Sequence, residues 1–167
     1  MELYKGLMTR RSVRQFSDKP VKKSVIQDVL KAAMHAPSSC NSQPWSFIVI
    51  TEKSDLLLLS KKHPYTKMAK DAAFAVLLLG EERKLTFKEF FPQDLAACAN
   101  TMLLAAHAKK IGGVWCGIYP NPKYMKTFDD LFHLKKDFTP FALLCFGYPT
   151  KKLAKINRYE KKRVAYL

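Results

Sequence analysis

The chain has 167 residues, of which 48% are hydrophobic and 26% are charged. This composition is typical of one folded domain and excludes disordered and collagen-like chains, so we expect a single domain over residues 1–167. The longest apolar run, residues 72–79, is far shorter than the roughly 20 residues that span a bilayer. The N-terminus also lacks the apolar core of a secretory signal. We therefore expect a cytoplasmic protein that has no membrane-spanning segment.

Lysine and arginine outnumber aspartate and glutamate by 29 to 14, which gives a net charge of +15. Most of the excess lies in residues 1–31 and 151–163, at the two ends of the chain. A surplus of this size indicates affinity for phosphates, nucleic acid or anionic surfaces. The sequence carries no zinc-finger, RNP-like or GXXG signature. Nucleic acid is therefore not an expected partner, although a small basic nucleic-acid-binding or adaptor domain stays open as the alternative.

The first half of the chain is predicted to contain two helices and a strand. Residues 2–8 fit a short helix, and residues 21–36 carry apolar side chains at helical spacing until Pro37 ends them. Residues 37–44 concentrate small polar turn formers between two prolines, which is typical of an ordered loop. A strand is expected at residues 46–51.

Three continuous apolar runs, residues 74–79, 114–118 and 141–146, predict strands that are buried on both faces. Residues 94–108, between the first two runs, predict a helix that is apolar nearly all round. A chain of this size rarely buries such a helix alone, so we expect a second subunit to cover it. A charge introduced there, as in Ala99→Glu, is expected to weaken the dimer.

A further amphipathic helix is expected at residues 122–132. Together these elements predict an α+β fold in which helices flank a mixed central sheet. The four cysteines form no C-x-x-C pair and have no histidine at zinc-ligand spacing, so we expect neither a disulfide framework nor a metal site.

Two segments have a composition suited to ligand binding. Residues 10–14 offer three guanidinium groups and a hydroxyl, which suit a phosphate because arginine donates in a bidentate fork. Residues 37–45 offer serine and amide groups in a rigid loop, which suit the edge of a planar heterocycle. A solvated basic turn and ordinary turn-stabilising contacts explain the same residues. The residues alone leave both interpretations open.

Five short motifs follow one another along the chain. They are Arg-Arg-Ser-Val-Arg-Gln-Phe at 10–16, Ala-Pro-Ser-Ser at 36–39, Asn-Ser-Gln-Pro-Trp at 41–45, Leu-Leu-Ala-Ala at 103–106 and Gly-Gly-Val-Trp-Cys-Gly at 112–117. In this order they resemble the FMN-dependent nitroreductase family over nearly the whole chain. The resemblance implies an α+β nitroreductase-like fold and an intertwined homodimer that binds two FMN molecules at its interface.

The resemblance also implies a set of cofactor-binding residues. They are Arg10, Arg11, Ser12, Arg14, Pro37, Ser38, Ser39, Asn41, Gln43, Trp115, Cys116, Gly117, Ile118 and Arg158. In family members, the first basic segment holds the FMN phosphate and ribityl chain, and a late basic residue completes the phosphate site. Here these roles fall to Arg10, Ser12 and Arg14, with Arg11 beside them, and to Arg158.

The flavin ring is expected to lie between two other segments. Residues 37–43 would approach it from the other subunit, and residues 115–118 would present their backbone to it. The Ile118 N–H is the expected donor to flavin N5. The resemblance departs from the family at residues 64–68, Pro-Tyr-Thr-Lys-Met, where larger members carry an Asn and a Lys that touch the flavin.

The implied activity is that of an oxidoreductase that uses FMN and NAD(P)H. Hydride passes from NAD(P)H to the flavin, and a nitroaromatic, quinone or similar small-molecule acceptor is then reduced in the same space, in a ping-pong scheme. We assign no catalytic side chain, since the flavin carries the chemistry. Arg14 would favour the reduced flavin through its charge near N1. An FMN enzyme of the same family with a specialised reaction stays open, as does a basic domain without flavin.

Overall fold

A four-stranded sheet forms the centre of the fold. The computed structural model describes residues 2–154 and 156–167, and its strands lie in the order β1-β2-β4-β3. Their bounds are β1 Trp45–Ile50, β2 Phe74–Glu81, β3 Gly112–Gly117 and β4 Phe138–Gly147. All neighbouring strands pair antiparallel. The sequence predicts a mixed sheet, with both parallel and antiparallel pairing. Within the described residues, parallel pairing is limited to one isolated bridge between Ser12 and Gly113.

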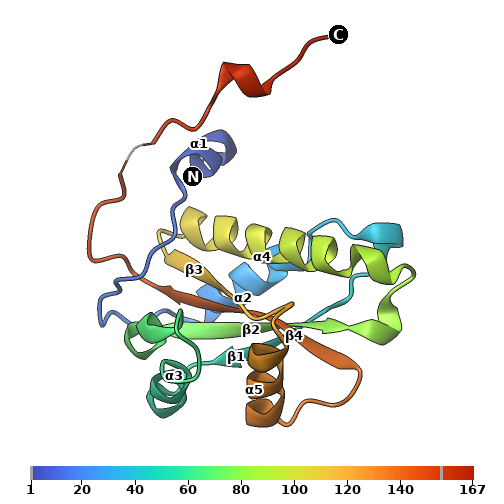
Figure 1. Ribbon diagram of the computed structural model, residues 1–167. Coiled ribbons are helices and arrows are strands. Elements are labelled where there is room, and N and C mark those ends of the chain that lie inside the picture. The colour runs from blue at the N-terminus through green and yellow to red at the C-terminus, as the bar shows by residue number, and fades with distance from the viewer. Residues whose placement is uncertain (1, 155) are drawn as a thin grey trace.

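Helices cover both faces of this sheet, as the continuous apolar strands predict (Figure 1). One face packs against α2, Lys23–Ala33, and α4, Phe91–Ala108. The other face packs against α3, Lys53–Leu59, and α5, Pro122–Phe132. Every residue of β2 is buried because its two faces belong to separate hydrophobic cores. The remaining helices are α1 at Leu3–Thr9 and short 3-10 helices at Ser39–Asn41, Lys67–Asp71, Glu82–Lys84, Lys88–Phe90 and Lys161–Arg163.

The observed helices differ from the predicted ones at their ends. Helix α2 is shorter at both ends than the predicted 21–36. Helix α4 begins three residues before the predicted Asp94, with Pro92 in its first turn, where a proline has no intrahelical hydrogen bond to lose. The sequence analysis did not predict α3, because its seven residues end in four consecutive leucines and show no helical alternation.

Helix α4 is buried on one side only. Ala99 is fully buried in the core of its own chain, so the expectation that it faces a partner is wrong. The opposite side of the helix carries Thr101 and Leu104, which are half-buried, and the exposed Asn100. This chain therefore leaves part of an apolar helix uncovered. No helix in the described ranges is both long and apolar enough to cross a membrane.

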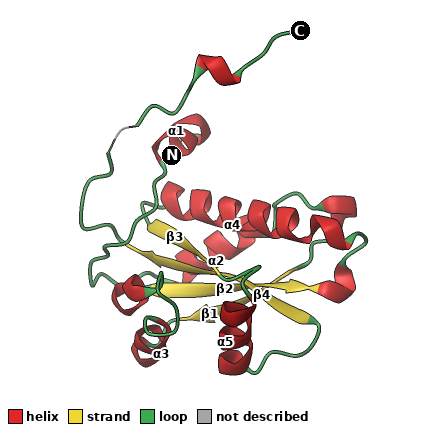
Figure 2. Ribbon diagram, in the orientation of Figure 1, coloured by secondary structure: helices red, strands yellow, loops and turns green. Residues whose placement is uncertain are grey.

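The two chain ends extend the sheet beyond β3. The Val13 N–H donates to the Gly113 carbonyl at 3.0 Å, and the Ser17 N–H donates to the Tyr148 carbonyl at 2.9 Å. Residues 12–17 therefore lie between β3 and the segment that follows β4. From there the C-terminal segment runs past α1 and away from the body of the molecule (Figure 2).

Candidate functional site

Basic residues from the two chain ends meet beside α1. Arg10 and Arg158 line one cavity of about 430 Å³ between α1 and the C-terminal segment. Burial, and then the charges of Arg158 and Arg11, lower the pKa of Arg10. The structure therefore brings together the two residues that the resemblance assigns to one phosphate, close enough to repel each other.

A second cavity, of about 440 Å³, lies between residues 11–15 on one side and residues 149–154 with Ile156 on the other. Arg14, Lys151 and Lys152 line it, together with Ser12. Among the described residues, no carboxylate lines either cavity. The ion pairs of the described chain involve other lysines and arginines. The cationic groups at these cavities thus lack a protein counter-charge, which is the condition for binding an anion.

Arg11 lines both cavities, but backbone carbonyls hold its guanidinium group. Its Nη1 atom donates to the carbonyl oxygens of Arg10, at 2.6 Å, and Met8, at 3.0 Å, and its Nη2 atom donates to the Ile156 carbonyl oxygen at 3.3 Å. Its Nε atom is buried and has no hydrogen-bond partner in the described chain. Three backbone carbonyl oxygens thus hold the terminal nitrogens of Arg11, and its role as a cofactor ligand stays a prediction.

His107, near the end of α4, also belongs to this region. Its Nε2 atom lies 2.8 Å from Thr9 Oγ1. Burial, followed by the charges of Arg10 and Arg11, lowers its pKa. The sequence alone favours a structural or surface role for this histidine and does not place it beside the basic segment. In the sequence, the residue is marked by its position as a histidine near the end of an otherwise apolar helix.

The C-terminal end of β3 presents backbone groups to open space. The Ile118 N–H donates to the Phe141 carbonyl at 3.1 Å, so its predicted role as the N5 donor is wrong. In an antiparallel ladder, hydrogen-bonded pairs alternate with pairs whose N–H and C=O point away from the partner strand. Gly117, which pairs with Ala142, therefore directs its N–H away from β4. Gly113 lies four residues earlier on the same strand, so its backbone groups point to the same outer side. There its carbonyl accepts a hydrogen bond from the Val13 N–H.

The side chain of Cys116 connects this strand end to the segment in which the chain departs from the family pattern. The Cys116 thiol donates to the Tyr65 carbonyl at 3.0 Å, and the Tyr65 N–H donates to His63 Nδ1 at 3.1 Å. A hydrogen bond with Cys145 and the charge of Arg14 lower the pKa of the Cys116 thiol against the opposing effect of burial. Arg14 therefore lies near the end of β3, and Tyr65 stands beside it with a largely exposed ring.

The loop between α2 and β1 is held in an unusual backbone conformation. Cys40, Asn41 and Gln43 all have positive φ. The loop is fastened by the Asp94 carboxylate, which accepts from the Ser39 N–H at 2.9 Å, and by Ser38 Oγ, which accepts from the Gln43 N–H. Such strain persists only where the surroundings fix it, and it is concentrated at functional sites.

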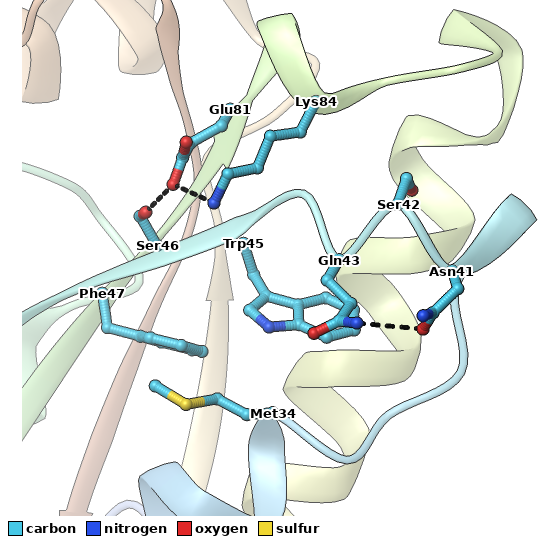
Figure 3. A pocket seen from close by; sticks show the side chains of 9 residues that line it. All are labelled: Met34, Asn41, Ser42, Gln43, Trp45, Ser46, Phe47, Glu81 and Lys84. Carbon is cyan, nitrogen blue, oxygen red and sulfur yellow. Dashed lines mark hydrogen bonds and ion pairs between the residues drawn. The ribbon is translucent and has the colours of Figure 1, made fainter.

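This loop forms one wall of a groove of about 620 Å³ (Figure 3). Asn41 and Gln43, two of the predicted flavin contacts, stand on its rim and are joined by a hydrogen bond of 3.0 Å. Met34, Trp45 and Phe47 line the same groove with apolar surface. At its other end the Glu81 carboxylate accepts from Ser46 and from Lys84. Pro37, Ser38 and Ser39 do not line this groove.

The loop and the basic segment lie at opposite ends of α4 (Figure 1). Asp94 fastens the loop near the start of the helix, and His107 contacts Thr9 near its end. Thirteen positions separate these two residues, which is about 20 Å along an α-helix. The loop and the basic segment that contains Arg10 are therefore far apart in one chain.

Comparisons with known proteins agree with this architecture. The model of the nitroreductase family matches residues 7–73 and 52–148. A Methanothermobacter thermautotrophicus protein, provisionally named NADH dehydrogenase/NAD(P)H nitroreductase, is 31% identical over 164 residues, which cover 98% of this chain and 86% of the relative.

Solved structures show the same similarity. A provisionally named NADH oxidase from Clostridium acetobutylicum superposes with a TM-score of 0.93 at 37% identity, over 96% of this chain and 97% of that one. A provisionally named nitroreductase from Desulfovibrio desulfuricans, solved in complex with FMN, shares the fold with a TM-score of 0.85 at 23% identity, over 100% and 97% of the two chains. Since the family model and a relative above 30% identity each cover most of the chain, this protein belongs to the nitroreductase family.

Proposed function

We propose that the protein is an FMN-dependent oxidoreductase that takes hydride from NAD(P)H and reduces nitroaromatic, quinone or similar small acceptors by a ping-pong mechanism. It would do so as one domain over residues 1–167 and as a homodimer. The observation that carries this proposal is the convergence of Arg10 and Arg158 on one cavity that no described carboxylate lines. The provisional name of the Methanothermobacter relative supports the same activity. The four free cysteines are in keeping with the reducing cytoplasm as its compartment.

The residues present fit FMN at both of its ends. A phosphate monoester matches the uncompensated guanidinium groups of Arg10 and Arg158, which can each donate charge-assisted hydrogen bonds. The ring requires a backbone surface that it can approach closely, and Gly117 supplies one, since a Cβ atom built there meets nothing within 4 Å. The FMN complex of the Desulfovibrio relative shows that this fold accommodates the cofactor in that protein.

The protein's contribution is to bind, orient and tune. When bound, FMN supplies the redox chemistry, accepting hydride from NAD(P)H and passing electrons to the acceptor. Arg10 and Arg158 would hold its phosphate, and Ser12 would lie toward the ribityl chain. The Gly117 N–H would point toward the ring from the edge of β3. Arg14, near Cys116, would place a fixed positive charge where electron uptake adds negative charge.

A complete ring site requires two chains in this proposal. Asp94, which fastens the loop at residues 37–43, lies about 20 Å along α4 from His107 beside the basic segment. The resemblance to the family assigns this loop to the flavin held by a partner. Asn41 and Gln43 already stand on the rim of an open groove, where they can reach a ligand outside their own chain. The half-buried Leu104 side of α4 supplies apolar surface for the association.

The visible spectrum of the purified protein, with mass spectrometry of the released cofactor, tests the proposal. Flavin absorbance and the mass of FMN are expected, with bleaching on addition of NADH or NADPH and recovery on addition of a quinone. FAD would contradict the phosphate assignment, and absence of any flavin affinity would favour the basic binding domain. Flavin that NAD(P)H reduces but no nitroaromatic or quinone reoxidises would favour a specialised reaction of the same family.

A further inference from the structure

Arg11 connects the end of α1 to the C-terminal segment. Two of the three carbonyl oxygens that it binds, those of Met8 and Arg10, lie at the end of α1, and the third belongs to Ile156. The guanidinium group is planar and donates from both of its terminal nitrogens, so it can hold acceptors on two sides at once. Arg11 is therefore a bridge between two segments that are distant in the sequence.

The C-terminal segment has few other attachments. Thr150 donates its N–H to the Gln15 carbonyl at 3.3 Å, and Leu153 is half-buried against the core. Among residues 156–167, the bond from Arg11 to Ile156 is the only hydrogen bond that reaches the rest of the described chain. Arg158 follows Ile156 by two residues, so the position of its charge depends on this contact.

Electrostatic repulsion opposes the same arrangement. Arg10, Arg11 and Arg158 line one cavity, and the charges of Arg158 and Arg11 lower the pKa of Arg10. No described carboxylate lines the cavities on either side of Arg11. Without an anion, the contact to Ile156 must hold the segment against this repulsion.

We propose that Arg11 is a positioning residue that docks residues 156–158 beside α1, so that Arg158 stands next to Arg10 and completes the phosphate site. Arg11 acts through the Ile156 carbonyl and does not touch the phosphate. The inference rests on the proposed function in one respect, that Arg10 and Arg158 bind the phosphate of FMN. It adds that docking of the segment and binding of the phosphate reinforce each other.

Arg11→Lys tests this role because it keeps the positive charge but loses the planar fork. We expect two effects. Trypsin should cleave the flavin-free variant after Lys151 and Lys152 about tenfold faster than wild type, and the affinity for FMN should fall about tenfold, both corresponding to one lost charge-assisted hydrogen bond. The affinity for riboflavin, which lacks the phosphate, should not change.

Arg163→Lys is the matched control. Arg163 lies in the same segment but binds only Glu160 within that segment, so this variant should match wild type in cleavage at Lys151 and Lys152 and in FMN affinity. The two measurements on Arg11→Lys can then be read separately.

Several results would overturn the positioning role. Unchanged cleavage with weaker FMN binding would make Arg11 a direct phosphate ligand, and faster cleavage with unchanged FMN binding would separate docking from the phosphate site. Unchanged values in both would remove Arg11 from the site. If Arg10→Ala and Arg158→Ala leave FMN affinity intact, the phosphate assignment itself fails, whatever Arg11→Lys does.

Discussion

Thr9 accepts a hydrogen bond from His107 and thereby ties α1 to α4. The Thr9 hydroxyl lies 2.6 Å from the Lys5 carbonyl oxygen and 2.8 Å from His107 Nε2. Its single hydrogen goes to the carbonyl, which can only accept, so His107 must donate from Nε2. Because α1 has no buried residue, this bond helps to fix the helix that Arg10 follows.

His107 predicts a pH dependence of stability in the flavin-free protein. Burial and the charges of Arg10 and Arg11 lower its pKa, so the unfolded chain takes up this proton at higher pH than the folded chain. The free energy of unfolding should be constant above about pH 6.5 as far as this group is concerned, and should fall as the pH drops toward the lowered pKa. Urea unfolding between about pH 7.5 and 5 measures this effect.

His107→Gln is the variant for that experiment because it keeps a donor for Thr9 and removes the titration. The loss of stability at low pH should be smaller in this variant. The same slope in both proteins would assign the effect elsewhere, and His63, whose pKa burial also lowers, would be the next residue to replace.

Arg10 and Arg158 are predicted to recognise phosphate and not the ring. Arg10→Ala and Arg158→Ala should each weaken FMN binding by about 1.5–3 kcal/mol, or roughly ten- to a hundredfold. Riboflavin binding should be unaffected, as should FMN binding by Arg83→Ala, which removes an arginine that pairs with Glu81. Fluorescence titration of the flavin-free proteins decides the matter, and equal losses for FMN and riboflavin would mean that the variants damage the fold.

Gly117 and Gly113 form a contrasting pair on β3. A Cβ atom at Gly113 would lie 2.7 Å from the Phe146 ring, whereas one at Gly117 meets nothing within 4 Å. Gly113→Ala should therefore destabilise the protein by about 1–3 kcal/mol through overpacking. Gly117→Ala should leave the unfolding free energy unchanged or slightly raised but weaken FMN binding by about tenfold or more, because the methyl group occupies space proposed for the ring. Normal FMN binding by Gly117→Ala would place the ring elsewhere.

Arg14 is predicted to act on the reduction potential. Its charge lies near the end of β3 and would stabilise the charge that a bound flavin gains on reduction. Loss of about 1.4 kcal/mol of this stabilisation in Arg14→Gln lowers the midpoint potential of a two-electron couple by about 30 mV. A spectroscopic redox titration measures the shift, and a midpoint equal to that of wild type would exclude Arg14 as the source of that charge.

The outer side of α4 is predicted to be a subunit interface. Leu104→Glu, on the half-buried side, should lower dimer content and FMN occupancy together while the monomer stays folded, because a ligand held by two chains stabilises their association by mass action. Ala99→Glu is the contrasting variant, since Ala99 is fully buried in its own core and a charge there should unfold the chain. Sedimentation with detection of both protein and flavin follows the two quantities. A flavin-saturated Leu104→Glu monomer would refute the shared site.

The sequence predicts most of the fold because burial leaves a direct signal. Strands β2 and β4 appear as continuous apolar runs because both of their faces are covered. The sequence of helix α4 shows that it is apolar, but not which of its sides faces its own sheet. For that reason Ala99 was wrongly expected to face a second subunit. Helix α3 gave no periodic signal at all.

The sequence predicts which residue types form the site, but not which way their side chains and backbone N–H groups point. Arg11 lines the same cavities as Arg10 and Arg14. That backbone carbonyls hold its side chain follows from the folded course of the two chain ends and could not be predicted from the sequence. The Ile118 N–H could not have been excluded from the sequence, because its direction follows from the register of β3 against β4.

The position of β3 at the end of the strand order has a consequence for the behaviour of the flavin-free protein in solution. Residues 12 and 13 pair with the edge of β3 at Gly113. The backbone N–H and C=O groups of Trp115 and Gly117 point to the same outer side but lie beyond the residues that this segment covers. Unpaired groups on a strand edge are a template for pairing with another chain. A cofactor lying against this edge would therefore also shield it, and protein stripped of flavin should aggregate more readily than the loaded form at equal concentration.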